Sequence, residues 1–156
     1  MIAKKHLILV AVGACVLGLV GFASQKKQVE RPLKGIMQLT GVITLSSDGI
    51  PLSLVVDGAG QCDPGGPVTS LGIGVLPYEG AEVFFVKATI TAANGDQLFT
   101  EAADPALTVI TGGTGRFEGA SGSFTIVYTK LEYRDGPFPG ILILDMEGLT
   151  EGTITY

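Results

Sequence analysis

The sequence predicts an all-β fold whose strands pair antiparallel. Glycine is abundant, with 23 residues, whereas only 16% of the 156 residues are charged and the mean hydropathy is +0.46. Runs of alternating apolar and polar residues are joined by short turns, and no useful length of chain has the apolar period of a helix. Because no helix is expected to cover a face of the sheet, the sheet must close into a barrel or fold over into a sandwich.

The first 23 residues are predicted to be a signal peptide. Lys4, Lys5 and His6 precede an apolar run over residues 7–22, and small residues lead up to an expected cleavage after Ala23. A run of this length suits a secretory segment, whereas a membrane span needs about 20 residues. We therefore expect an exported protein, secreted or periplasmic. The alternative is an uncleaved N-terminal segment that anchors the protein to a membrane.

Cleavage would change the charge and the chemistry of the chain. Eight basic residues would remain against 15 acidic ones, a net charge of −7. That balance argues against nucleic acid and anionic membrane surfaces as partners. The only histidine would be lost, which excludes catalytic triads and histidine-containing metal sites. Cys62 would remain alone, unable to form an intramolecular disulfide, and is expected to be a loop thiol.

No metal or cofactor is expected. Asp57 and Asp63 lie near Cys62 around a glycine-rich stretch, but they lack the further oxygen ligands at fixed spacing that calcium requires. A polar turn is the simpler interpretation of this stretch.

The first half of the predicted sheet contains three strands. Residues 24–34 are polar and are expected to form a leader, so that the domain spans 35–156. Residues 36–45 and 52–57 alternate around an Asp48-Gly49 turn, which supplies the positive φ of a tight hairpin. Residues 58–67 are expected to be a loop or a strongly bulged region, and 68–76 a weak strand. The residues of the first strand expected to share one face are Met37, Leu39, Ile43 and Leu45.

The second half begins with the strongest expected strand, 82–92, and an Asn94-Gly95 hairpin turn. Residues 97–101 return, 107–110 enter a glycine loop, 117–133 leave it, and 141–146 and 152–156 close the sheet. On strand 82–92 the residues expected to share one face are Phe84, Val86, Ala88 and Ile90.

The glycine loop, TGGTGRFEGASGSF at residues 111–124, is compatible with two structures. Its glycine spacing resembles a dinucleotide-binding loop, but such a loop must open a helix whose N-terminus meets the phosphates. Here an alternating β-branched and aromatic run follows instead, and no lysine of the Walker type is present. The loop is therefore predicted to be a structural turn, with Phe117 plugging one end of the core.

The same stretch resembles the glycine-phenylalanine motif of bacterial proteins with an allene oxide cyclase barrel-like domain, and plant dirigent proteins carry a similar motif. TAANGDQLF and the terminal GTITY resemble further stretches of the bacterial family, so the resemblance runs from Gly35 to Tyr156. It implies a closed, calycin-like antiparallel β-barrel of about eight strands, often oligomeric, that holds a hydrophobic intermediate and guides its cyclisation or coupling. The matching residues are scaffold residues, namely Gly112, Gly113, Gly115, Phe117 and Gly119. The polar catalytic set of the plant cyclase and the acidic residues of dirigent pockets have no match.

A stripe of one parity on residues 124–132 is the candidate ligand pocket. It consists of Phe124, Ile126, Tyr128, Lys130 and Glu132. If this face points inward, an apolar floor grades into a tyrosine and a charged pair at the barrel mouth, as ligand pockets often do. A carboxylate beside apolar walls has a raised pKa, which makes Glu132, with Tyr128, the candidate acid–base residue.

The opposite face of the same run is the alternative interior. It consists of Thr125, Val127, Thr129, Leu131 and Tyr133, and it would leave Lys130 and Glu132 as a surface pair that contributes almost nothing to stability. On the last strands, Leu142, Leu144 and Met146 are expected to complete the pocket. Asp145 and Glu147 would then face solvent.

Three functions follow from these expectations. The first is an exported barrel that binds a small hydrophobic molecule in its interior. The second is a cofactor-independent isomerase or cyclase of the allene oxide cyclase or dirigent type, acting by conformational confinement. The third is a packed barrel that serves as an envelope or structural protein and forms a homo-oligomer. A void above about 300 Å³ would favour the first two.

Overall fold

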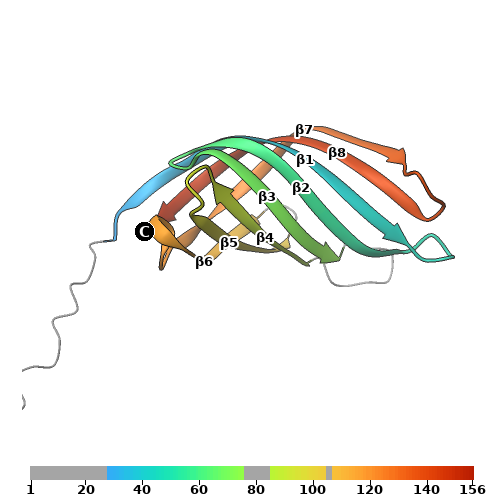
Figure 1. Cartoon of the computed structure of the whole chain (residues 1–156), viewed down its shortest axis with the longest axis horizontal. Coiled ribbons are helices and arrows are strands. Elements are labelled where there is room, and N and C mark those ends of the chain that lie inside the picture. Colours follow the sequence, from blue (N-terminus) through green and yellow to red (C-terminus); the bar gives the residue numbers. More distant parts are fainter. Residues whose placement is uncertain (1–27, 76–84, 105–106) are drawn as a thin grey trace, which may run out of the picture.

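The computed structural model describes residues 28–75, 85–104 and 107–156, and in it eight antiparallel strands form one closed barrel (Figure 1). Each strand pairs with the next along the chain, and β8 pairs with β1. This confirms the predicted barrel. The predicted signal peptide, 1–23, lies outside the described residues. The elements are β1 (Glu30–Leu45), β2 (Pro51–Asp63), β3 (Gly66–Val75), β4 (Phe85–Ala92), β5 (Gln97–Asp104), β6 (Leu107–Gly113), the short 3₁₀ helix η1 (Gly115–Phe117), β7 (Ser121–Asp135) and β8 (Ile141–Thr155).

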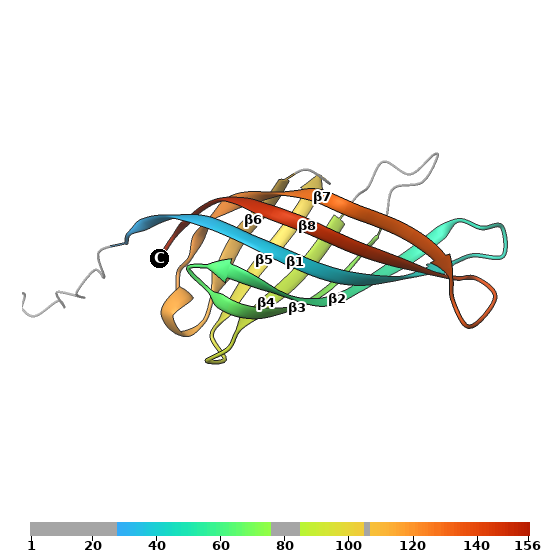
Figure 2. The ribbon, with the colours of Figure 1, turned by 90° about the horizontal axis from the view of Figure 1, so that it is seen from above.

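The barrel is asymmetric because its strands differ in length. β1, β2, β7 and β8 have 13 to 16 residues, whereas β4, β5 and β6 have seven or eight. The long strands extend beyond the short ones at the end that carries the β1–β2 and β7–β8 turns (Figures 1 and 2). The C-terminus and η1 lie at the opposite end. The two ends of the barrel are therefore built differently.

The first strand begins within the segment expected to be a polar leader. β1 starts at Glu30, which pairs with Thr155 of β8, and Leu33 is only 5% exposed. Lys34 also forms an ion pair with Glu151 at 3.1 Å. Pairing with the C-terminal strand orders these residues, and that partner is more than 100 residues away along the chain.

Residues 58–62 are strand, not the loop that their glycines suggested. β2 continues to Asp63 and stays paired with β1, with Gly58 opposite Leu39 and Gly60 opposite Met37. A Cβ atom at Gly58 would collide with the carbonyl oxygen of Gln38. These glycines permit the backbones of β1 and β2 to approach closely. A glycine-rich composition alone does not distinguish such a strand from a loop.

The glycine loop is a structural turn, as predicted. β6 ends at Gly113, η1 follows, and β7 begins at Ser121 without any α-helix. Gly115 has φ +60. The ring of Phe117 is 2% exposed and packs edge-to-face on Tyr156, with 5.3 Å between ring centroids. The nucleotide-loop interpretation is thereby excluded, because the loop opens no α-helix whose N-terminus could meet a phosphate, only the three-residue η1.

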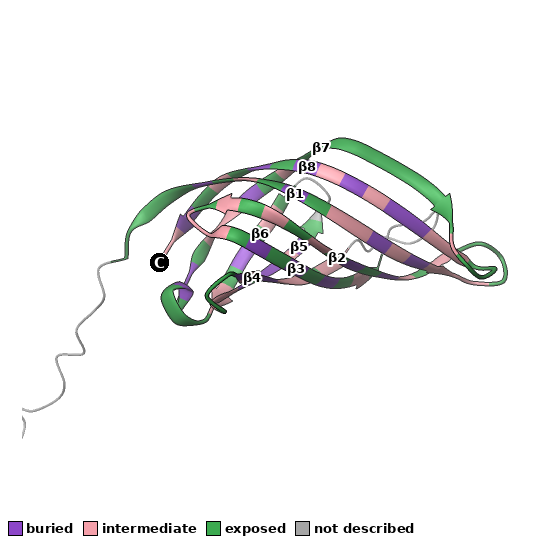
Figure 3. Cartoon of the chain, turned by 45° about the horizontal axis from the view of Figure 1, so that its top comes forward, coloured by how far each residue is buried: buried purple, intermediate pink, exposed green. Residues whose placement is uncertain are grey.

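Burial alternates along the strands, so one face of each strand forms the barrel interior (Figure 3). One core cluster fills the end of the barrel that carries η1, which we call the closed end. This closed-end cluster comprises Leu33, Val68, Ile90, Ala92, Leu98, Ile110, Phe117, Ala120, Phe124 and Ile154. A second cluster lies under the long strands and comprises Ile43, Leu54, Val56, Leu144 and Met146. Within the described ranges, the structure contains no helix long and apolar enough to cross a membrane.

Candidate functional site

A β-bulge in β7 decides which of its side chains face the interior. Tyr128 pairs with Gly148 of β8, but the next paired residue, Lys130, faces Glu147, so Thr129 is an extra residue in β7. One extra residue reverses the inward and outward faces of everything that follows it. The stripe that the sequence predicted as one continuous face is therefore split at Thr129.

The split places Lys130 and Glu132 on the outside of the barrel. Their side chains are 43% and 67% exposed and form an ion pair at 3.2 Å. Glu132 lies opposite Asp145, which also points outward. The expectation that Lys130 and Glu132 line the mouth of the pocket is wrong, and Glu132 has no access to the interior as a catalytic acid or base. An exposed pair of this kind contributes little to stability.

Two residues of the alternative face take the inward positions instead. Leu131 lies opposite Met146 and Tyr133 opposite Leu144, and all four line the same cavity. Before the bulge, Phe124, Ile126 and Tyr128 face inward as predicted. The first expected inward face is thus correct before the bulge, and the alternative face is correct after it.

The barrel interior contains a cavity of about 280 Å³. It is partly open to solvent, because Tyr128, Leu131 and Tyr133 on its wall are all exposed. Its wall is mainly apolar and comes from every strand, with the residues Met37, Leu39, Leu54, Val56, Gly72, Val86, Ala88, Ile90, Ala102, Phe124, Ile126, Leu131, Leu144 and Met146. Leu144 and Met146 lie where the sequence predicted them. Leu142 is half-buried and packs against the second cluster rather than on the cavity wall.

Hydroxyl groups are the polar side chains on the cavity wall. They belong to Ser70, Thr100, Thr108, Tyr128 and Tyr133. Thr100 donates a hydrogen bond to the carbonyl oxygen of Ala88 at 3.2 Å. Partial burial raises the pKa of Tyr128, so its phenol stays protonated at neutral pH. Among the lining residues of the described chain there is no Asp, Glu, Lys or Arg, which makes the cavity neutral.

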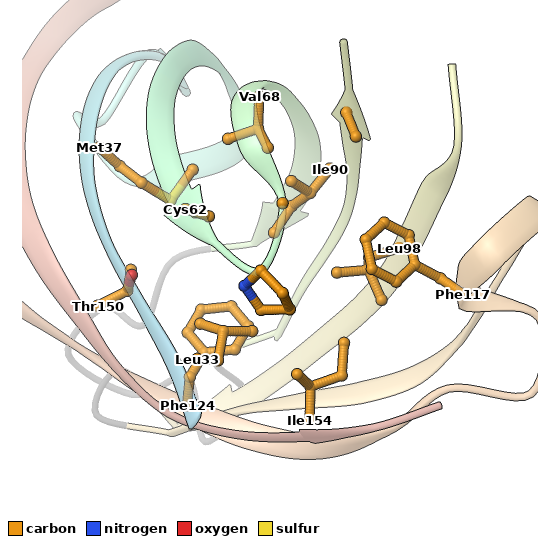
Figure 4. Close-up of a pocket in the computed structure, with 13 residues that line it drawn as sticks. Leu33, Met37, Cys62, Val68, Ile90, Leu98, Phe117, Phe124, Thr150 and Ile154 are labelled. Carbon is orange, nitrogen blue, oxygen red and sulfur yellow. The ribbon is translucent and has the colours of Figure 1, made fainter. Parts of the chain in front are cut away.

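Met37, Ile90 and Phe124 separate this cavity from a second, much smaller void. They line both spaces, and the void beyond them measures about 20 Å³ within the closed-end cluster (Figure 4). Cys62 points into this void from β2, so it is not the loop thiol expected from the sequence. Burial raises the pKa of its thiol, which makes it a poor nucleophile at neutral pH.

Thr150 carries an unsatisfied hydroxyl in the same void. The residue is 3% exposed, and its Oγ1 atom has no hydrogen-bond partner. The thiol of Cys62 lies beside it, and burial raises the pKa of this thiol by more than the contact with the Thr150 hydroxyl lowers it. Both residues flank Gly35 of β1, whose missing side chain leaves room for them. Nothing in the local sequence indicates this juxtaposition of residues 88 positions apart.

The carboxylates considered in the sequence analysis do not form a catalytic or metal-binding site. Asp145 and Glu147 face outward, as predicted, and Asp145 is held by Arg134 at 2.8 Å and by the Thr40 hydroxyl at 3.4 Å. The Arg134 guanidinium lowers the pKa of Asp145. Asp57 points away from the interior, whereas Cys62 points into it. In the described part of the chain no three His, Cys, Asp or Glu residues gather where they could hold a metal ion.

Comparisons with known proteins give structural similarity only. No family model matches the sequence, and no curated protein matches it. The solved structure of the pterocarpan synthase dirigent protein GePTS1 is 16% identical, with 81% of this chain and 86% of that chain covered and a TM-score of 0.47. That of the pterocarpan synthase dirigent protein PsPTS1 is 11% identical, with 80% and 95% covered and a TM-score of 0.43. The fold of this chain is defined by its own strand order and register.

Proposed function

We propose that this protein binds a small, neutral, mainly apolar molecule inside its barrel, and that it acts as an exported binding protein. One observation supports the proposal most strongly, namely a mainly apolar cavity of about 280 Å³ in the barrel interior. Small-molecule pockets measure about 300 to 1,000 Å³ and combine apolar walls with a few placed polar groups. This cavity lies just below that range, so it suits a compact ligand. A barrel with no binding role would be expected to fill this space, because close packing is the rule in protein interiors.

The lining chemistry limits the class of ligand. No charged side chain of the described residues meets the cavity, so a charged ligand would lose its hydration without gaining a partner. The hydroxyls of Ser70, Thr108, Tyr128 and Tyr133 can donate to or accept from a ligand carbonyl or hydroxyl. A compact hydrocarbon skeleton with one or two oxygen atoms fits both requirements.

The alternative of a cyclase or isomerase has less support from the side chains. Its candidate carboxylate, Glu132, lies outside the barrel. The raised pKa of Tyr128 keeps its phenol protonated, so that it could donate a proton but not act as a base. The resemblance of the glycine loop to the allene oxide cyclase and dirigent families concerns scaffold residues. Binding without turnover is therefore the function that we propose first.

Two neighbouring alanines on β5 provide a matched test. Ala102 is 9% exposed and lines the cavity, whereas Ala103 is exposed on the opposite face of the strand. Ala102→Phe would fill the cavity, and Ala103→Phe adds the same ring to the surface. Binding of the neutral apolar probe N-phenyl-1-naphthylamine would be followed by its fluorescence. We expect saturable binding by the natural protein and by Ala103→Phe, and loss of binding in Ala102→Phe.

Native mass spectrometry of protein purified from its producing cells identifies the natural ligand. A small molecule released on denaturation would give its chemical class, and the same spectrum reports whether residues 1–23 have been removed. Equal probe binding by all three proteins would overturn the assignment of the cavity. Absence of both probe binding and a co-purified molecule would favour a packed structural barrel.

A further inference from the structure

Among the described residues, the second half of β7 has a paired strand on one side only. β6 pairs with β7 at only three positions, the last being Thr108 with Phe124. From Thr125 to Asp135, β7 pairs with β8 on one side, and no strand of the described residues pairs with its other side. Residues 127–135 are all exposed, and this part of β7 is continuously exposed in Figure 3.

Such an edge presents unpaired backbone donors and acceptors to solvent. An edge strand of this length is a template for another strand, and natural proteins often protect edges with charged side chains. Here the charges do not share one sign. Lys130 and Glu132 lie two residues apart on the same outward face and already attract each other at 3.2 Å. A second strand whose charges alternate in the opposite order could therefore pair with this edge, whereas charges of a single sign would repel every copy of the same strand.

The pattern is complementary to itself when two copies of β7 run antiparallel about Leu131. In that register Lys130 of one copy lies opposite Glu132 of the other, and the reverse pair forms by symmetry. Directly opposite unlike charges stabilise an antiparallel pair, and like charges destabilise it. The two pairs would form an alternating square of four charges.

Neighbouring registers are less favourable. Centring the pair on Glu132 places that carboxylate against its own copy and Lys130 against Arg134. Centring it on Tyr133 would pair Glu132 with Arg134, but Arg134 is already bound to Asp145 at 2.8 Å. The register centred on Leu131 is favoured, because its two unlike pairs form among Lys130 and Glu132 of the two copies without involving the Arg134–Asp145 pair.

We propose that two copies of this chain associate through the free edges of their β7 strands, antiparallel and centred on Leu131. The interface is isologous, because a two-fold axis makes each residue meet its symmetry mate across the strand pair. Its occupant is a second copy of the chain, and the association does not depend on the proposed binding function.

A charge-reversal experiment tests the proposal. Sedimentation velocity on protein with its natural N-terminus should reveal a concentration-dependent dimer. Lys130→Glu places two like-charged pairs in the interface, and so does Glu132→Lys, so each should weaken self-association about tenfold or more. Mixing the two variants restores unlike pairs and should give a heterodimer as stable as the natural dimer. The double exchange, Lys130→Glu with Glu132→Lys, should also dimerise.

A matched control uses the ion pair Lys34–Glu151, which is at least as exposed but lies between two fully paired strands. Lys34→Glu should leave self-association unchanged. Leu131→Cys in a Cys62→Ser background should form a disulfide-linked dimer, because residue 131 faces its own copy in the proposed register. A monomer at all concentrations would show that the charges prevent this edge from pairing with another copy. A dimer that neither reversal weakens would place the interface elsewhere, and each result overturns the proposal.

Discussion

Removal of the Phe117 ring should strongly destabilise the closed end of the barrel. The ring is 2% exposed and belongs to the closed-end cluster. Transfer of a buried phenylalanine side chain to water costs about 2 to 3 kcal/mol. Its edge-to-face contact with Tyr156 adds about 1 kcal/mol. Each 40 Å³ of void that the neighbours fail to fill adds about 1 kcal/mol more.

These contributions predict that Phe117→Ala lowers the free energy of unfolding by about 4 kcal/mol, within the range known for such substitutions. Urea unfolding followed by circular dichroism measures the change, with an unchanged m-value as the condition for comparison. Phe138→Ala is the control, because Phe138 is 71% exposed and its removal should change stability by no more than about 0.5 kcal/mol. A loss below about 2 kcal/mol at Phe117 would refute its role as the plug of the closed end.

Three further predictions concern other parts of the structure. Thr150→Val removes a buried hydroxyl whose Oγ1 atom lacks a well-formed hydrogen bond, and thermal and urea unfolding should show a gain of about 1 kcal/mol. A loss would mean that the hydroxyl is satisfied, by the Cys62 thiol or by a water in the adjacent void. Gly58→Ala should destabilise by more than about 2 kcal/mol in the same assay, because the new Cβ atom meets the Gln38 carbonyl oxygen; near-neutrality would contradict the close strand approach. NMR titration should place the pKa of Asp145 below its ordinary value, and Arg134→Gln should raise it. Because the pKa of Asp145 is lowered in the folded state, the stabilisation from the Arg134–Asp145 pair is present at neutral pH and is lost as the pH falls through the acidic range. An unchanged pKa of Asp145 in Arg134→Gln would disprove the pairing.

The sequence predicted the parts of the fold that depend on local patterns. Alternating residues identified the inward face of β1, with Met37 and Ile43 buried, and the Asn-Gly and Asp-Gly pairs marked two hairpin turns whose glycines have positive φ. The glycine loop was correctly interpreted as a turn because a phosphate-binding loop requires a helix that the following residues cannot form. These features are set by backbone preferences over a few residues.

Errors arose where distant strands decide the local structure. Residues 58–62 have the composition of a loop, but pairing with β1 holds them in β2. Residues 30–33 have the polarity of a leader, but the last strand of the chain pairs with them. In both places the stabilising backbone hydrogen bonds come from residues that no local window includes.

The candidate site shows the same division. From the sequence, Phe124, Ile126, Tyr128, Leu144 and Met146 were assigned to the interior, and all five line the cavity. The position of Lys130 and Glu132 depended on a single extra residue at Thr129, which has no sequence signal and is visible only in the register against β8. The sequence alone determined the class of fold and the apolar character of its interior, because these follow from alternation and turn chemistry. The tertiary structure alone decided where the cavity lies, which side chains enter it and which strand edge stays unpaired in the described part of the chain, because these depend on the register and unequal lengths of strands far apart in the chain.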